Sequence, residues 1–217
     1  MPLTRSRRAR AQRLSSITPF HVMALLSRAR ELEAQGRSVV HMEIGEPDFA
    51  SPQPIVEAGI RALQAGKTHY TPAVGLAELR HRIAQHYGDT YGVSIDPRRI
   101  LITPGASGAL QLILGLLVDP GSEVVMTDPG YPCNRNFVYL YEGVPVSVAV
   151  EAKHGYQLTP ELLQQRLSDK TSCVLIATPS NPTGTLVSED VLRGLLRVVR
   201  EHGVALLVDE IYHGLTY

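Results

Sequence analysis

The sequence predicts an α/β protein: a largely parallel sheet with helices on both faces, preceded by an N-terminal arm and helix. From residue 100 onward, short apolar runs rich in valine, leucine and isoleucine alternate with segments of helical periodicity. Continuous apolar runs are typical of strands buried on both faces, and intervening helices are typical of parallel connections. With 217 residues, 44% of them hydrophobic and 19% charged, the chain is long enough and apolar enough to bury a sizeable core.

Helices are expected in the first hundred residues, because apolar side chains recur there at the three-to-four-residue spacing of an amphipathic helix. The expected segments are residues 20–35, 54–65 and 76–87. A short extended run, residues 38–44, is followed by a turn-forming Gly-Glu-Pro-Asp.

Beyond residue 100 strands and helices are expected in turn. The predicted strands are residues 100–103, 123–127, 144–150, 172–178 and 204–208, and the predicted helices are residues 107–118, 131–141, 159–167 and 188–202. Thr159 and Ser188 are expected to cap the last two helices through their hydroxyl groups.

Composition excludes several classes of function. The 21 basic and 21 acidic side chains balance, which argues against a nucleic-acid partner. The most apolar stretch, residues 109–118, is too short and too interrupted to span a membrane. Cys133 and Cys173 lie far apart and outside any C-x-x-C pattern, which indicates reduced thiols in a cytoplasmic protein.

The basic residues are unevenly distributed along the chain. Residues 1–30 hold seven arginines and no acidic residue. Such a start is typical either of an organelle transit peptide or of a solvated arm that leads into a helix, and both interpretations stay open. No apolar segment follows the arginines as a secretory signal requires.

Ligands of open α/β sheets bind at the carboxyl ends of the strands, so the chemistry is expected there. The first such segment, Thr103 to Gly108, is small and glycine-rich and leads directly into a predicted helix. Gly105 and Ala106 would let an anion approach the helix N-terminus, and Ser107 would add a hydroxyl donor. A tight turn with a serine cap explains the same residues equally well.

Tyr131 and Asn181 follow two further strands in proline-stiffened loops. Tyr131 can stack on a planar ligand, or it can pack on the rim of the sheet. Asn181 can donate to a ring oxygen, although Asn-Pro is also a common start of a turn.

Asp209 follows the apolar run of residues 204–208, and its carboxylate is therefore expected at the end of a buried strand. A carboxylate there requires a cationic partner, for which a protonated ring nitrogen is suitable. Capping of a following helix is the alternative. Tyr212 would present its phenol to the same ligand.

No metal site is expected, since His81 and His86 are five residues apart and no other metal-binding spacing occurs.

Together these segments require a ligand with a phosphate, a planar ring, a ring oxygen and a basic ring nitrogen. Pyridoxal 5′-phosphate has all four. The combination is much more specific than any one of its parts.

The sequence resembles the class I/II aminotransferases, which are fold-type I pyridoxal-phosphate-dependent enzymes. The segments that carry the resemblance occur in the family's order between residues 16 and 217. They are residues 43–49 (EIGEPDF), 69–75 (HYTPAVG) with Leu79-Arg80, 103–110 (TPGASGAL), 128–132 (DPGYP), 179–184 (PSNPTG) and 209–212 (DEIY).

The resemblance implies a role for each matching residue. Gly105, Ala106 and Ser107 would bind the cofactor phosphate. Tyr131 would stack on the pyridine ring, and Asp209 would pair with the pyridine nitrogen. Asn181 and Tyr212 would form hydrogen bonds with the phenolic oxygen. Gly45 would lie beside the substrate carboxylate. Tyr70 would reach the phosphate bound by a neighbouring subunit, which implies a homodimer. The implied activity is transfer of an amino group between an L-amino acid and a 2-oxo acid in amino-acid metabolism or a biosynthetic process.

The sequence departs from the family at the catalytic position. The family's Schiff-base lysine lies a few tens of residues after the Asp-x-x-Tyr motif, in a Ser-x-Ser-Lys context, and Lys67, Lys153 and Lys170 lack that context. No catalytic residue is therefore assigned, and little turnover is expected from the 217 residues alone.

The expected organisation is an N-terminal arm and small-domain segment at 1–50 and a cofactor-binding large domain, incomplete at its C-terminus, at 51–217. A pyridoxal-phosphate-dependent lyase of the same fold and a non-catalytic fragment are the alternatives.

Overall fold

The structure is a computed structural model that describes residues 10–45 and 49–216 of the chain. It divides into two compact units, one formed by Met1–Phe20 together with Ala106–Tyr217 and the other by His21–Gly105. We refer to these as the sheet unit and the helical unit. No helix in the described part of the chain is long and apolar enough to cross a membrane.

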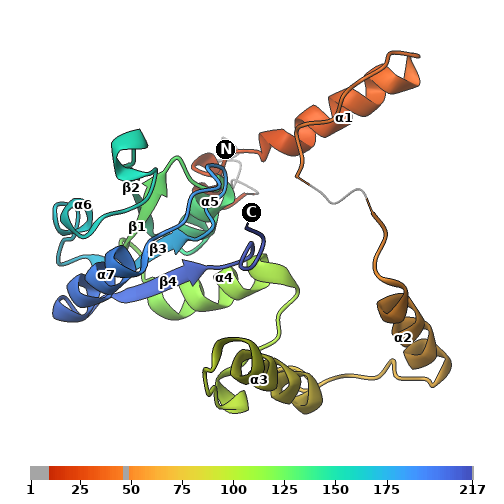
Figure 1. Ribbon diagram of the computed structural model, residues 1–217. Coiled ribbons are helices and arrows are strands. Elements are labelled where there is room, and N and C mark those ends of the chain that lie inside the picture. The colour runs from red at the N-terminus through yellow and green to blue at the C-terminus, as the bar shows by residue number, and fades with distance from the viewer. Residues whose placement is uncertain (1–9, 46–48, 217) are drawn as a thin grey trace, which may run out of the picture. The chain divides into compact units, whose positions relative to one another are not determined.

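The sheet unit contains a four-stranded parallel sheet (Figure 1). Its strands are β1 (Glu123–Asp128), β2 (Val144–Ala149), β3 (Thr171–Ala177) and β4 (Ala205–Asp209), in the spatial order β2-β1-β3-β4. Every neighbouring pair is parallel. The α/β prediction is therefore confirmed, and all four strands end at one edge of the sheet, which we call the carboxyl edge.

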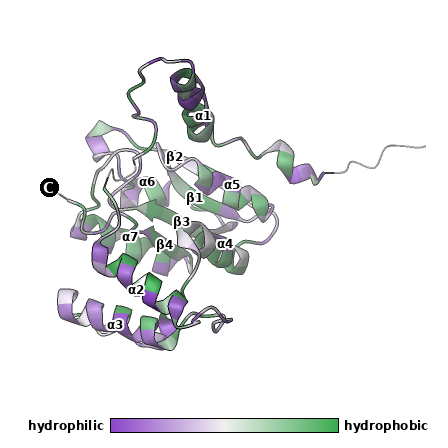
Figure 2. Ribbon diagram, turned by 90° about the vertical axis from the view of Figure 1, so that its right-hand side faces the viewer, coloured by the Kyte–Doolittle hydropathy of each residue, from purple (hydrophilic) through white to green (hydrophobic). Residues whose placement is uncertain are grey.

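Helices cover both faces of this sheet, as the apolar strands predict. On β1, Val124 and Met126 face one hydrophobic cluster while Val125 faces the other, as the two-residue alternation of a strand requires. The first cluster joins the sheet to α4 (Gly105–Leu117) and α5 (Cys133–Leu140) through Leu110, Leu114, Val118, Val124, Met126, Val138, Cys173 and Leu175. The second joins it to α6 (Pro160–Gln164) and α7 (Glu189–Glu201) through Val125, Val148, Leu158, Leu163, Val174, Ile176, Leu195, Val198 and Val199. Figure 2 shows the hydrophobic strands enclosed in this way.

The predicted caps are confirmed. Thr159 accepts a hydrogen bond from Leu162 N at the start of α6, and Ser188 accepts one from Val191 N at the start of α7, both at 3.3 Å. The strands and helices of the sheet unit begin and end within about three residues of their predicted bounds, as expected where local signals set the ends.

The interpretation of residues 204–208 as a buried strand is wrong. β4 is one of the two edge strands of the sheet, and each of its residues is only partly buried. An apolar run reports the hydrophobicity of a strand, whereas its burial depends on which elements lie beside it.

The helical unit contains α1 (His21–Ala34), α2 (Gln53–Gln64), α3 (Ala77–Tyr91) and the short helix η2 (Pro97–Arg99). Its three long helices confirm the predicted ones. α3 continues a full turn beyond its predicted end, to Gly92, whose left-handed backbone (φ 67°) ends the helix.

The strand predicted at residues 100–103 is absent from the structure. None of the four strands pairs with this segment, and Ile102 N instead donates to Val74 O at 3.1 Å. A strand needs a neighbouring strand for its hydrogen bonds, and an apolar run by itself does not supply one. Residues 38–44 likewise belong to no strand.

The N-terminal arm of the sheet unit packs beside α5. It contains the short helix η1 (Gln12–Ser15), and Arg13 forms an ion pair with Glu142 at 2.8 Å. Asn136 Nδ2 donates to Thr18 O at 3.1 Å. Residues 10–20 are therefore tied to the sheet unit by specific contacts.

Candidate functional site

The carboxyl edge brings together the polar side chains that follow three adjacent strands. Tyr131 follows β1, Asn181 follows β3, and Asp209 and Tyr212 stand at and after the end of β4. β1, β3 and β4 are consecutive in the sheet, with about 4.8 Å between neighbours. The topology thus places these four residues at one side of the unit.

Tyr131 is the most strongly perturbed titratable residue at this edge. A hydrogen bond with Cys133 and partial burial raise the pKa of the Tyr131 phenol from 10.0 to about 12, with smaller contributions from Tyr212 and Asp209. The Tyr131 phenol therefore stays neutral at physiological pH.

The loop that carries Asn181, residues 178–185, is compact and closed by backbone hydrogen bonds. Ser180 N donates to Thr185 O at 2.9 Å, and Gly184 N donates to Ser180 O at 2.8 Å. We call this segment the Asn181 loop. Its conformation places Asn181 in the lining of a pocket that Tyr131 also lines.

That pocket contains a buried polar atom with no hydrogen-bond partner. Asn134, near the start of α5, is 8% exposed, and its Oδ1 is unpaired. The guanidinium of Arg135 lines the same pocket and is held 3.9 Å from Asp128. An unpaired buried oxygen is costly, so this pocket is suited to a ligand or water that donates a hydrogen bond.

Asp209 makes a local turn rather than a helix cap. Its Oδ1 accepts a hydrogen bond from Ile211 N at 3.1 Å, and no helix follows β4 in the described chain. Its backbone carbonyl accepts a hydrogen bond from Thr178 N at 3.0 Å, which ties the end of β4 to the Asn181 loop. The contact with Ile211 orients the carboxylate and occupies only one of its two oxygens.

The N-terminus of α4 lies at the same edge. α4 packs along the sheet from Leu110 to Val118 and is joined to the start of β1 by a short turn, so it runs antiparallel to β1 (Figure 1). Gly105 opens the helix with a left-handed backbone (φ 73°), and the space where a Cβ would stand is empty. The first backbone N–H groups of a helix have no partner within the helix, and here Ala106 and Ser107 supply them.

Gly45 and Tyr70 belong to the helical unit, whereas the carboxyl edge belongs to the sheet unit. Tyr70 is fully exposed and stands beside Thr68, His69 and Thr71 at a surface pocket. Residues 46–48 of the predicted 43–49 motif lie outside the described residues. The predicted contributions of Gly45 and Tyr70 stay predictions.

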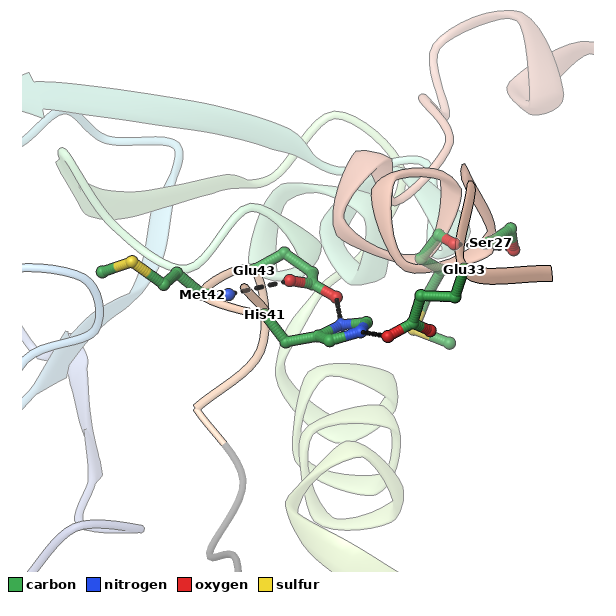
Figure 3. Close-up of polar contacts among 6 residues, drawn as sticks. Ser27, Glu33, His41, Met42 and Glu43 are labelled. Carbon is green, nitrogen blue, oxygen red and sulfur yellow. Dashed lines mark hydrogen bonds and ion pairs between the residues drawn. The ribbon is translucent and has the colours of Figure 1, made fainter. Parts of the chain in front are cut away.

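The segment that leads to Gly45 is held by a histidine between two carboxylates (Figure 3). His41 Nδ1 lies 2.6 Å from Glu43 Oε1, and His41 Nε2 lies 2.9 Å from Glu33 Oε1 on α1. Glu43 Oε2 also accepts a hydrogen bond from Met42 N at 2.9 Å. These contacts raise the pKa of the His41 imidazole, with Glu43 the larger cause, and lower that of the Glu43 carboxyl through its bond to His41.

Two lysines of the sheet unit lie away from Asp209. Lys170 precedes β3 at the opposite edge of the sheet, and its carbonyl accepts a hydrogen bond from Glu123 N. Lys153 follows β2, which two strands separate from β4, and it pairs with Glu151 at 2.8 Å. Lys67 belongs to the helical unit.

The donor set of the carboxyl edge fits pyridoxal phosphate. A helix N-terminus suits a phosphate, a fixed neutral phenol ring suits stacking on a flat heterocycle, and a carboxylate suits a protonated ring nitrogen. The unpaired Oδ1 of Asn134 is consistent with a bound group. No cluster of metal-ligating side chains occurs among the described residues.

Three residues around this edge were not identified from the sequence. Phe20 contacts Tyr131 edge-on, Asn134 lines the pocket, and Gln157 bonds to the Asn181 loop. Each lies outside the motifs and reaches the site through the fold. Of the three, only Gln157 offers a signal in the sequence, because it is a polar residue beside the apolar Leu158. That signal is weak.

A parallel sheet with this constellation at its carboxyl edge is the architecture of the fold-type I aminotransferases. Residues 37–217 match the family model of aminotransferase class I and II, and the chain belongs to this family. Pyridoxal phosphate is the cofactor of class I and II aminotransferases.

Known proteins of this family are similar along almost the whole chain. A (5-formylfuran-3-yl)methyl phosphate transaminase of Methanocaldococcus jannaschii is 41% identical over 95% of the chain and 53% of its own length. The aspartate aminotransferase of Geobacillus stearothermophilus is 38% identical over the same shares. The structure of the Thermus thermophilus aspartate aminotransferase with maleate is similar with a TM-score of 0.90 and 34% identity, over 97% of this chain and 55% of that one. The chain therefore spans about half the length of the relatives it matches.

Proposed function

We propose that this chain binds pyridoxal 5′-phosphate at the carboxyl edge of its sheet and that the protein containing it is an aminotransferase. The reaction would move an amino group between an L-amino acid and a 2-oxo acid. The observation that carries the proposal is the meeting of Tyr131, Asn181, Asp209 and Tyr212 at the ends of three adjacent strands. These residue types provide a stacking ring, two hydrogen-bonding groups and a carboxylate.

The phosphate would bind at the N-terminus of α4. Backbone N–H groups of Ala106 and Ser107 would donate to its oxygens, Gly105 would let the anion approach the backbone, and the Ser107 hydroxyl would add a further donor. Ser107 is exposed, so its side chain is free to turn toward the anion. The positive end of the helix dipole favours the same charge.

The ring would lie against Tyr131, with Asn181 and Tyr212 donating to its phenolic oxygen. Pyridoxal phosphate supplies, when bound, a protonated pyridine that withdraws electrons from the bond broken at the amino-acid α-carbon. Asp209 would hold that proton on the ring nitrogen, and each unit by which it raises the nitrogen's pKa corresponds to about 1.4 kcal/mol. Its contact with Ile211 N fixes the carboxylate for this purpose.

The helical unit would complete the site in a homodimer. Gly45 would lie beside the substrate carboxylate, where the absence of a side chain leaves room, and Tyr70 would reach the phosphate bound by a neighbouring subunit. α2 supports an association of two copies, because none of its side chains is buried and its apolar residues, including Ile55, Ile60 and Leu63, are exposed. Exposed apolar patches of this kind mark protein interfaces.

The division of the chain into an arm and small-domain segment at 1–50 and a cofactor-binding domain at 51–217 is part of this proposal. So are a cytoplasmic location and a role in biosynthetic amino-acid metabolism. Relatives named for aspartate support an amino-acid and 2-oxo-acid substrate class.

Two measurements test the proposal on the protein as its gene encodes it. Titration with pyridoxal phosphate should give a saturable absorbance change that Asn181→Ala weakens and that Tyr139→Phe, a phenol on α5 that the proposal does not use, leaves unchanged. Incubation with an L-amino acid and 2-oxoglutarate should then form glutamate. Absence of cofactor binding contradicts the proposal, and release of ammonia or thiol without formation of pyridoxamine phosphate favours a lyase.

A further inference from the structure

Gln157 is a buried amide that makes no part of the proposed cofactor contacts. It lies between the short helix η3 (Ala152–His154) and α6, and it is 5% exposed. Its Nε2 lies 2.8 Å from Thr185 O, 3.1 Å from Thr185 Oγ1 and 3.3 Å from Ala177 O. Ala177 immediately precedes the Asn181 loop and Thr185 ends it, so one amide group joins both ends of this loop.

The local backbone explains how a glutamine comes to lie there. After β2 the chain forms η3 and then two consecutive left-handed residues, Gly155 (φ 59°) and Tyr156 (φ 53°). This turn brings Gln157 and Leu158 under the sheet, where both are buried. The side chain therefore approaches the Asn181 loop from the core side of the fold.

The acceptors that Gln157 satisfies form the closing bonds of the loop. Thr185 O accepts from both Ser180 N and Gln157 Nε2, which uses the two lone pairs of that carbonyl. Thr185 Oγ1 also contacts Thr183 Oγ1 at 2.9 Å. Without the amide donor, partly buried carbonyl oxygens at both ends of the loop would lose a partner, which disfavours the closed conformation.

We propose that Gln157 is a positioning residue for Asn181: it holds the Asn181 loop closed and thereby keeps the Asn181 side chain at the pocket shared with Tyr131. The importance of Asn181 for the cofactor rests on the proposed function. The holding of the loop rests on the hydrogen bonds alone, so the two parts can be tested separately.

The main variant is Gln157→Met, which keeps the length of the side chain and removes the donor. In the protein as its gene encodes it, hydrogen exchange without cofactor should become faster at the amides of Ser180 and Gly184. The dissociation constant of pyridoxal phosphate should rise about tenfold, which corresponds to about 1.4 kcal/mol. Gln157→His, which retains one N–H donor, should have a smaller effect and provides a second variant if Gln157→Met does not fold.

A double-mutant cycle separates positioning from a general loss of stability. If Gln157 acts through Asn181, then Gln157→Met should weaken cofactor binding little further in an Asn181→Ala background. The matched control is Thr171→Val, which removes another buried polar group, at the opposite end of β3. It should lower stability without changing loop exchange or the dissociation constant.

Two results overturn the proposal: unchanged exchange at Ser180 and Gly184 in a folded Gln157→Met protein, or losses of cofactor affinity that add fully in the double variant. If the unsubstituted protein does not bind pyridoxal phosphate, the proposed function fails instead. Faster loop exchange in that case still supports the closing role of Gln157, and unchanged exchange still overturns it.

Discussion

The ring of Phe20 meets the ring of Tyr131 edge-on, with 5.9 Å between centroids and 72° between planes. Phe20 is the last residue of the N-terminal arm, and Tyr131 stands at the carboxyl edge more than a hundred residues later. Through this contact the arm helps to hold the Tyr131 ring, which we propose stacks on the cofactor. Edge-to-face aromatic pairs contribute about 0.5–1.5 kcal/mol beyond their buried area.

Replacing this support should weaken cofactor binding. Phe20→Ala removes the edge contact, and we expect the dissociation constant of pyridoxal phosphate to rise by about two- to tenfold. Phe20→Leu keeps most of the bulk but not the aromatic edge. Its dissociation constant should lie between those of the unsubstituted protein and Phe20→Ala. An unchanged constant in Phe20→Ala, measured by absorbance titration, would contradict the supporting role.

The Asp209 carboxylate should be required for its charge rather than its shape. In Asp209→Asn the amide oxygen can still accept the hydrogen bond from Ile211 N, so the stability of the cofactor-free protein should change by less than about 0.5 kcal/mol. Transaminase activity should fall by a factor on the order of 100 or more, because an electrostatic contact with the reacting group is lost. Asp128→Asn, at the end of β1, is the matched control and should retain most of the activity. Equal losses in both variants would argue against a specific role of Asp209.

The Tyr131 phenol should ionise near pH 12 rather than 10, and Cys133→Ala should lower its pKa, because the hydrogen bond with Cys133 is the largest cause of the shift. Because the pKa of Tyr131 is raised in the folded state, its contribution to stability is fully present below pH 10. That contribution is lost as the pH rises from 10 to about 12. Alkaline difference absorbance of the protein minus that of Tyr131→Phe measures the ionisation. A phenol that titrates at its ordinary value would be inconsistent with this environment.

The His41 bridge should make stability dependent on pH in the neutral range. Its raised pKa means that the contribution is fully present below the unfolded value of 6.5 and is lost as the pH rises through the folded value. His41→Asn should therefore be less stable than the unsubstituted protein at about pH 6, with the difference shrinking towards pH 9. Chemical denaturation at several pH values checks this, and high salt should reduce the effect because the groups are partly exposed. A difference that is the same at every pH would show that protonation of His41 is not involved.

Two leucines on α4 should differ sharply in their effect on stability. Leu114 is fully buried in the cluster between α4 and the sheet, whereas Leu116 is 83% exposed. Leu114→Ala should lower the free energy of unfolding by about 3 kcal/mol through lost burial and a cavity. Leu116→Ala should change it by less than about 0.5 kcal/mol. Similar losses in the two variants, measured by denaturant titration, would contradict the packing of α4.

Local signals account for the parts of the fold that were predicted correctly. Thr159 and Ser188 cap their helices through hydroxyl bonds that reach only three residues along the chain. The continuous apolar runs of β1 and β3 match strands whose successive residues contribute to the two clusters on opposite faces of the sheet. Such features depend on neighbours in sequence, and the residues themselves reveal them.

Errors and omissions arose where distant residues decide the outcome. Residues 100–103 are apolar enough for a strand but have no strand beside them, and β4 is apolar but lies at the edge. Gln157 donates hydrogen bonds to Ala177 and Thr185, which lie 20 and 28 positions further along the chain. Phe20 contacts Tyr131, more than a hundred positions away in the sequence. No periodicity or motif records such pairings.

The family, the α/β class and the chemical types at each strand end could be predicted from the residues alone, because these depend on local patterns of polarity and on motif spacing. The tertiary structure was needed to show that β3 separates β1 from β4, and therefore that Tyr131, Asn181, Asp209 and Tyr212 share one edge. It also decided which side chains support them, since Phe20 and Gln157 contribute through non-local packing and hydrogen bonds. The physical reason is the same in each case: strand order and burial are properties of contacts between distant segments.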